Sequence, residues 1–185
     1  MKRFIGAALS LGLLLAPCAH AEDLPLAGGA GTPFRAQCPA GQYLVGFSGS
    51  DGAFIDSLRP LCAAWNADTK SFDAPVEFDK KFGGAGGAAY RIECPRTMAI
   101  RELRPLAGSE PKVIRGIRNI YCYAPAPSKD TQGLANLGPE MTEYTDRGST
   151  PQYCEEGMAI GVYGRGGRYL SAIGLICGPA PQAPQ

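Results

Sequence analysis

The residues best suited to chemistry are two pairs of carboxylates. Asp51 and Asp56 lie close together in "GSDGAFID", and Glu155 and Glu156 are adjacent. Glycoside hydrolysis needs two carboxyl groups that flank one bond at a defined separation, and nothing in the sequence sets that separation. Adjacent residues of a strand point to opposite faces, so the two glutamates are not expected to share a substrate. The sequence therefore favours a binding protein, and we do not expect an enzyme.

The N-terminus has the pattern of a secretory signal peptide. Lys2 and Arg3 precede an apolar run that ends in "AHA", so we predict a signal peptide over residues 1–21, cleaved after Ala21. Cys18 follows Pro17, which does not suit a lipid-attachment site. No later stretch reaches the roughly 20 apolar residues that a membrane-spanning helix needs. The mature protein is expected to be secreted or periplasmic, with no membrane span.

Loss of the signal peptide changes the charge of the chain and removes its histidine. Without Lys2 and Arg3, 16 of the 18 basic residues remain against 17 acidic ones, and such neutrality argues against nucleic acid as a partner. His20 is the only histidine of the chain and is removed as well. A chain without histidine has no Ser-His or Cys-His pair and no imidazole metal ligand, so we expect no cofactor and no metal.

Six cysteines remain in the mature chain. An even number of cysteines in an exported protein indicates disulfides, and the six allow 15 pairings in principle. Because the sequence around them repeats, we predict sequential pairs, each stabilising the fold by about 3 kcal/mol. Zinc is disfavoured because there is no C-x-x-C motif and no histidine. The predicted bridges are Cys38–Cys62, Cys94–Cys122 and Cys154–Cys177.

The repeat has three copies, at about 28–82, 83–137 and 138–177. A glycine run, an aromatic residue and a cysteine open the first two copies, as "GGAGTPFRAQC" and "GGAGGAAYRIEC". The third copy is reduced to "DRGSTPQYC", residues 146–154. We predict one domain over 22–177 and a disordered tail over 178–185, because the tail is rich in proline.

Each copy also holds two short apolar stretches around a turn, as in "YLVGF" and "FIDSLRPLC" of the first. Such runs, bounded by Gly, Pro, Ser and Asp, predict β-hairpins, and no window predicts an amphipathic helix. Apolar residues three apart, such as Ile55 and Leu58, predict a bulge or bend near the centre of 57–60 and of 172–175. The second copy needs a one-residue slip before Ile117 aligns with its counterparts. The fold is therefore predicted to be all β.

A lone hairpin is marginally stable, so each copy must lend its apolar face to a shared core. The order of glycine run, aromatic residue, cysteine, strand, Gly-rich turn and "IDSL" resembles the repeat of the vitelline membrane outer layer protein I family. The "GGAGG" run and "FIDSL" are also similar to the repeat of jacalin-like lectins. Both families imply a β-prism, with three antiparallel sheets as its sides and pseudo-threefold internal repeats.

The resemblance to jacalin-like lectins also implies a glycan site among loops at one end of the prism, held by backbone amides, an aspartate and an aromatic ring. Glycine lets a polyol approach the backbone closely, and a carboxylate accepts hydrogen bonds from two hydroxyls. The Gly-rich turns "GSDGAFID" and "GRGGRYLS" are the nearest equivalents. The candidate ligand-binding residues are Gly49, Asp51, Phe54, Asp56, Arg165 and Tyr169.

Each candidate also has a structural interpretation. Hairpin turns need glycine for positive φ, and the aromatic rings could pack on each other. Trp65 is either a packing residue or a ligand platform. Arginines of the second copy, such as Arg101 and Arg115, suit a solvated sheet face, or a surface for an anionic glycan or an acidic protein partner. The leading hypothesis is a secreted protein that binds a glycan, and the alternative is an envelope component that binds an extracellular protein and no sugar.

Overall fold

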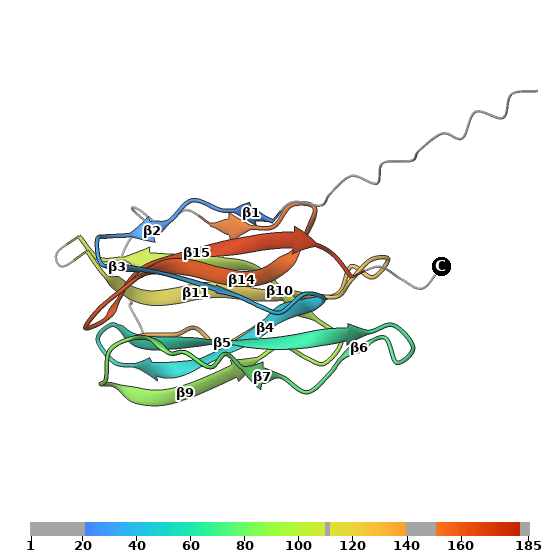
Figure 1. Ribbon diagram of the computed structural model, residues 1–185, viewed down its shortest axis with the longest axis horizontal. Coiled ribbons are helices and arrows are strands. Elements are labelled where there is room, and N and C mark those ends of the chain that lie inside the picture. Colours follow the sequence, from blue (N-terminus) through green and yellow to red (C-terminus); the bar gives the residue numbers. More distant parts are fainter. Residues whose placement is uncertain (1–20, 110–111, 140–150, 182–185) are drawn as a thin grey trace, which may run out of the picture.

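The computed structural model describes residues 21–109, 112–139 and 151–181. Within these ranges the chain forms fifteen strands and no helix, so the all-β prediction is confirmed. The strands form three antiparallel sheets around a common core, which makes the fold a β-prism (Figure 1). The predicted signal peptide, apart from Ala21, lies outside the described residues.

The strand bounds are as follows. The five-stranded sheet contains β1 (Glu22–Asp23), β2 (Ala27–Gly28), β3 (Thr32–Gln37), β14 (Gly157–Gly166) and β15 (Leu170–Pro179). The six-stranded sheet contains β4 (Gln42–Asp51), β5 (Ile55–Asn66), β6 (Ser71–Phe72), β7 (Val76–Glu77), β8 (Phe82–Gly83) and β9 (Ala88–Glu93). The four-stranded sheet contains β10 (Ala99–Ala107), β11 (Ile114–Tyr123), β12 (Thr131–Gly133) and β13 (Gln152–Tyr153).

Each sheet is built around the hairpin of one copy, and the copies exchange strands. The central hairpins are β4–β5, β10–β11 and β14–β15. The strand that opens each copy pairs with the hairpin of another copy: β3 with β14, β9 with β4, and β13 with β10. These pairings link the three sheets in a ring. Three independent hairpins would lack such links.

The disulfides join the predicted cysteine pairs, Cys38–Cys62, Cys94–Cys122 and Cys154–Cys177. The first cysteine of each pair lies where the chain leaves the neighbouring sheet. There its amide donates to a carbonyl of that sheet, over 2.8 Å from Cys38 to Ile160 and 2.7 Å from Cys94 to Val45. Each bridge therefore does more than close a hairpin. It also attaches that hairpin to the segment where the chain crosses from one sheet to the next.

The closing strand of each hairpin carries a β-bulge near the turn. The extra residue is Asp56 in β5, Arg115 in β11 and Ser171 in β15. The bulge explains why Ile55 and Leu58, three residues apart, are both fully buried in the same cluster. A bulge was predicted near the centres of 57–60 and 172–175, whereas the structure has it just before each of these stretches.

The second copy contains one further irregularity. Between Arg118 and Tyr121 the strand β11 has one residue more than its partner β10, and Asn119 in this stretch has a positive φ of 47°. This extra residue is the one-residue slip predicted from the sequence. It brings Ile117 and Ile120 into the same buried cluster.

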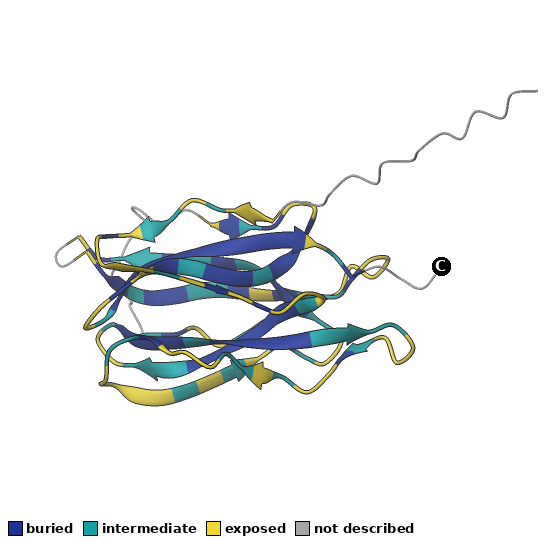
Figure 2. Ribbon diagram, in the orientation of Figure 1, coloured by how far each residue is buried: buried dark blue, intermediate teal, exposed yellow. Residues whose placement is uncertain are grey.

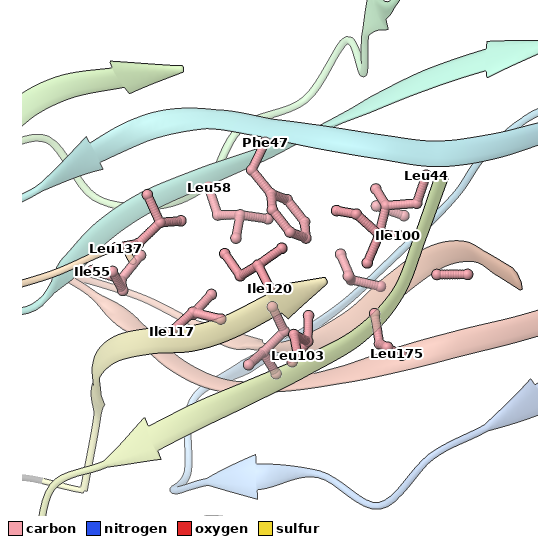
Figure 3. Packing of buried hydrophobic residues seen from close by; sticks show 14 of the residues in the cluster. Leu44, Phe47, Ile55, Leu58, Ile100, Leu103, Ile117, Ile120, Leu137 and Leu175 are labelled. Atoms are coloured by element: carbon pink, nitrogen blue, oxygen red, sulfur yellow. The ribbon is translucent and has the colours of Figure 1, made fainter. Parts of the chain in front are cut away.

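The core lies between the three sheets and takes side chains from all of them. Figure 3 shows Phe47 and Leu58 opposite Ile117 and Ile120, with Leu175 beside them, and each of these side chains is fully buried. Burial of these apolar side chains is the main stabilising contribution to such a fold. The outer strand β9 is mostly exposed or half-buried (Figure 2), so the hairpins supply the interior.

The C-terminal prediction needs correction. Strand β15 continues to Pro179, and Pro181 is buried. The chain after Cys177 therefore continues a strand that is already paired, and it ends against the domain at Pro181. The disordered tail predicted from residue 178 does not begin there. Residues 182–185 lie outside the described residues.

Candidate functional site

The turns of the three hairpins gather at one end of the prism, called here the tip end and defined by residues 52–54, 112–115 and 167–169. The ring of Phe54 lies 4.8 Å from the ring of Tyr169, between centroids. The guanidinium carbon of Arg115 lies 5.2 Å from the centroid of Phe54. The first, second and third copies thus each contribute one side chain to a single cluster.

Asp56 occupies the bulge next to this cluster. The residue is 8% exposed, and its carbonyl accepts a hydrogen bond of 2.8 Å from the amide of Gly84. Within the described residues, no hydrogen bond to its side-chain carboxylate is found. The fully buried side-chain atoms without a hydrogen-bond partner include no oxygen of Asp56, so its carboxylate reaches solvent and can accept hydrogen bonds from a ligand.

The glycine run that opens the second copy surrounds the Asp56 carboxylate. A Cβ at Gly86 would lie 2.6 Å from Oδ1 of Asp56, and one at Gly87 would lie 2.7 Å from Oδ2. Gly87 also has a φ of +67°, which other residues seldom adopt. Glycine is therefore required for the loop to lie this close to the carboxylate. We call Gly52, Phe54, Asp56, Gly86 and Gly87 together the Asp56 site.

Asp51 has a different role from Asp56. Its Oδ2 accepts a hydrogen bond of 2.6 Å from the amide of Gly138, at the start of the third copy. This contact joins the turn of the first copy to a loop far away in the sequence. Asp51 therefore connects two loops of the tip end, and its role as a ligand-binding residue stays a prediction.

Gly49 lies within strand β4, away from the turn, and pairs with Leu58 and Tyr90. A Cβ at Gly49 would lie 2.8 Å from the hydroxyl of Tyr90, and that hydroxyl donates to the carbonyl of Ser57 over 3.0 Å. Gly49 is therefore needed for the packing of a strand. The structure thus places Gly49 in the sheet and not in the turn, and a glycine in a sheet and a glycine in a turn are alike in sequence.

Tyr90 is the aromatic residue that follows the glycine run of the second copy. Burial raises the pKa of its hydroxyl strongly, and the Asp51 carboxylate raises it further. The hydroxyl consequently stays protonated and serves as a donor within the sheet. Phe34 takes the matching place in the first copy, and a Cβ at Gly164 would lie 2.8 Å from its ring.

The third copy repeats the Asp56 site with different side chains. The carbonyl of Ser171 accepts a hydrogen bond of 2.8 Å from the amide of Gly29, as the carbonyl of Asp56 does from Gly84. Arg165 is exposed, and its Nη1 donates to the carbonyl of Gly29 over 3.4 Å. Arg165 thus lies beside the loop of the first copy, and the structure does not bring it to Asp56, whereas Tyr169 does reach Phe54.

The glycine runs are the part of the site that the sequence prediction missed. Gly28, Gly83 and Gly138 have positive φ, and a Cβ at each would clash with the carbonyl of the bulge residue opposite. Their even spacing was the available signal. In the third copy it is Gly138 that packs against a bulge residue, Arg115. The sequence alignment, which placed the counterpart of the glycine run at residue 146, is therefore corrected.

Trp65 lies near the opposite end of the prism, called the base end, where β5, β11 and β15 finish. Its ring meets that of Phe72 edge-on, with 4.9 Å between centroids. It also lines a groove of about 500 Å³ with Lys70, Pro125, Pro127 and other residues. Trp65 is therefore partly a packing residue and is remote from the tip end.

Arg101 shows how the arginines of the second copy are used. Its Nε donates to the carbonyl of Cys154 over 2.7 Å, and its Nη2 donates to the carbonyl of Glu155. Its guanidinium carbon lies 4.7 Å from the centroid of the Tyr153 ring. Arg91 likewise pairs with Glu77 over 2.7 Å. These two arginines therefore connect strands of the prism.

Two further findings concern the described residues only. No group of three or more His, Cys, Asp and Glu side chains among them could hold a metal ion. No helix in that part of the chain is long and apolar enough to cross a membrane.

Solved structures with the same fold include several lectins. The chain is similar to the Malaysian banana lectin (TM-score 0.58, 16% identity, 86% of this chain and 99% of the lectin). It is similar to a mannose-binding jacalin-related lectin from Ananas comosus (TM-score 0.58, 19% identity, 86% and 98%). It is also similar to the Calsepa lectin, solved with a biantennary N-glycan (TM-score 0.57, 14% identity, 90% and 99%).

These comparisons confirm the jacalin-like β-prism fold. The resemblance to the vitelline membrane outer layer protein I family stays a prediction. No protein-family model matches the sequence, and no curated protein matches it.

Proposed function

We propose that the protein binds glycans and that one sugar residue lies at the Asp56 site. The observation that carries the proposal is the Asp56 carboxylate, which belongs to a largely buried residue, has no hydrogen bond from the described residues and lies against a loop of glycines. A carboxylate can accept hydrogen bonds from two neighbouring hydroxyls, and such charge-assisted bonds are about twice as strong as neutral ones. A sugar offers this pair of hydroxyls.

The surroundings of Asp56 suit a sugar in two further ways. Gly86 and Gly87 are exposed and have no side chains, so a polyol can approach their backbone closely. The ring of Phe54 contacts Tyr169 and Arg115 and is only half-buried, so its exposed part can offer an apolar surface to the C–H face of a sugar. The proposal therefore gives the carboxylate the role of fixing the hydroxyls, and it gives Phe54 the role of a platform.

The proposal implies one site of this kind for each chain. The equivalent bulge residues are Ser171 and Arg115, and neither offers a carboxylate. The similar lectin from Ananas comosus binds mannose, so mannose-containing glycans are the first ligands to test. Three disulfides are typical of exported proteins and support the proposal that the protein acts outside the cytoplasm, after cleavage near Ala21.

A glycan array with the purified mature protein tests the proposal. We expect binding to a limited set of glycans and loss of that binding in Asp56→Ala. Ser171→Ala, the same change in the equivalent bulge, should bind as the wild type does. Absence of binding to every glycan, together with recovery of a protein partner in a pull-down, would instead support the alternative of a protein-binding envelope component.

A further inference from the structure

We infer that the glycan at the Asp56 site is acidic and that its carboxylate or sulfate group lies in a second pocket, between residues 80–83 and the turn at Gly166–Gly167. The inference rests on the proposed function of the Asp56 site. It adds the chemical class of the ligand and a separate group of residues that would select it. We call this pocket the lysine pocket.

The lysine pocket is a small hollow of about 180 Å³. Its apolar wall is formed by Phe34 and Phe82, whose rings stack with 4.2 Å between centroids. Lys80 and Lys81, both exposed, stand at its border, and Nζ of Lys80 lies 5.9 Å from the centroid of Phe82. The volume corresponds to about six water molecules in the liquid. It therefore suits one charged substituent or one ring, and it is too small for a folded partner.

The lysine pocket adjoins the Asp56 site through one loop. Gly83 lines the pocket, and a Cβ on Gly83 would clash with the carbonyl of Asp56. On the other side, a Cβ on Gly166 would lie 3.2 Å from the amide nitrogen of Gly83. The glycine run thus lies between the lysine pocket and Asp56. Neighbouring sugar residues of one oligosaccharide could occupy both.

The described residues of the tip end carry more positive than negative charge. Exposed cations lie on its loops at Lys80, Lys81, Lys112, Arg165 and Arg168. Among the described residues, the carboxylates of the tip-end turns are those of Asp51, which accepts a hydrogen bond from Gly138, and of the largely buried Asp56. Asp79, next to Lys80 in sequence, lines a different groove together with Gln42 and Val76.

The whole chain has a formal net charge of only +1, so this gathering of cations does not reflect a basic protein. Clustered charges of one sign raise the local concentration of ligands of the opposite sign. An acidic protein would experience the same attraction. The small volume of the lysine pocket and its contact with the Asp56 site favour an acidic glycan.

The test uses an array of matched glycan pairs: uronates against their carboxyl-reduced forms, and sulfated glycans against their desulfated forms. We expect the wild-type protein to bind the acidic member of a pair at least about tenfold more tightly, with a preference that weakens as salt rises. The double variant Lys80→Ala/Lys81→Ala should lose this preference and keep its affinity for the neutral member. Lys70→Ala, an exposed lysine near the base end, is the matched control, and melting temperatures verify that all variants are folded.

Other outcomes separate this inference from the proposed function. Equal affinity of the wild type for both members, or an unchanged preference in the double variant, would overturn the lysine pocket and leave the Asp56 site standing. If acidic glycans bind Asp56→Ala as tightly as they bind the wild type, they adsorb to surface charge. That result would overturn the link between the Asp56 site and the lysine pocket. Equally strong competition by poly-glutamate would also overturn selection of glycans. Absence of all glycan binding would overturn the proposed function itself.

Discussion

Asp56 and Ser171 are the extra residues of equivalent β-bulges in the first and third copies. Each is 8% exposed, and the carbonyl of each accepts a hydrogen bond of 2.8 Å from a glycine-run amide. The backbone at the two positions is therefore alike, and the side chains differ in charge. Changes at these two positions can separate an effect on the fold from an effect on a ligand.

Gly87→Ala should both destabilise the fold and disrupt the Asp56 site. Its φ of +67° is unfavourable for alanine, and the new Cβ would lie 2.7 Å from Oδ2 of Asp56. We expect a loss of about 2 kcal/mol or more in the free energy of unfolding, measured with urea. Glycan binding should fall as well.

Gly41→Ala is the matched control for this change. Gly41 has a similar φ of +77°, and a Cβ there would meet nothing within 4 Å. Its cost should be limited to backbone strain, about 1 kcal/mol, with unchanged glycan binding. Equal effects of the two changes on binding would argue against a role of the glycine run in the Asp56 site.

Tyr90→Phe should reduce stability modestly and change its pH dependence. The hydrogen bond to the Ser57 carbonyl is expected to contribute about 1 kcal/mol. Because burial raises the pKa of Tyr90 in the folded state, its contribution is complete below the ordinary tyrosine pKa of about 10. That contribution is lost as the pH rises above this value, since only the unfolded chain then releases the proton.

Urea unfolding at pH 8 and at pH 10.5 tests this prediction. The wild type should lose more stability between these pH values than Tyr90→Phe does. Tyr163→Phe is a useful comparison, because the pKa of Tyr163 is also raised but its side chain lies in a different sheet. An identical loss in the wild type and in Tyr90→Phe would show that the Tyr90 hydroxyl is not the group responsible.

Removal of one disulfide should destabilise the prism without changing its topology. In Cys38→Ala/Cys62→Ala the free energy of unfolding is expected to fall by about 3 kcal/mol, as measured by urea unfolding. Peptide mapping by mass spectrometry of the wild type should recover only bridges within a copy. A bridge between cysteines of different copies would contradict the fold described here.

The sequence predicted the disulfides and the three hairpins because both follow from local patterns. Cys38 and Cys62 enclose one hairpin, and short apolar runs around a glycine turn indicate strands. The exchange of strands between copies was not predicted. The pairing of β3 with β14 joins residues far apart in the chain, and no local pattern specifies such a pair.

The candidate site was predicted in part, because local patterns reveal turns but do not reveal contacts between copies. Phe54, Asp56 and Tyr169 were recognised in the turns, and the structure gathers them at the tip end. The glycine run that covers Asp56 belongs to the next copy and reaches it only through the crossing of β9 to β4. Gly49 was placed in the site because its neighbours are turn residues, although its own position is inside a strand.

The most direct test of the central claim is the glycan affinity of Asp56→Asn, measured by isothermal titration calorimetry with the best ligand from the array. Loss of charge-assisted hydrogen bonds, each contributing about 1.5–3 kcal/mol, predicts binding weaker by about tenfold to a hundredfold. The melting temperature should change little, and Ser171→Ala should bind as the wild type does. Wild-type affinity in a folded Asp56→Asn protein would contradict the account.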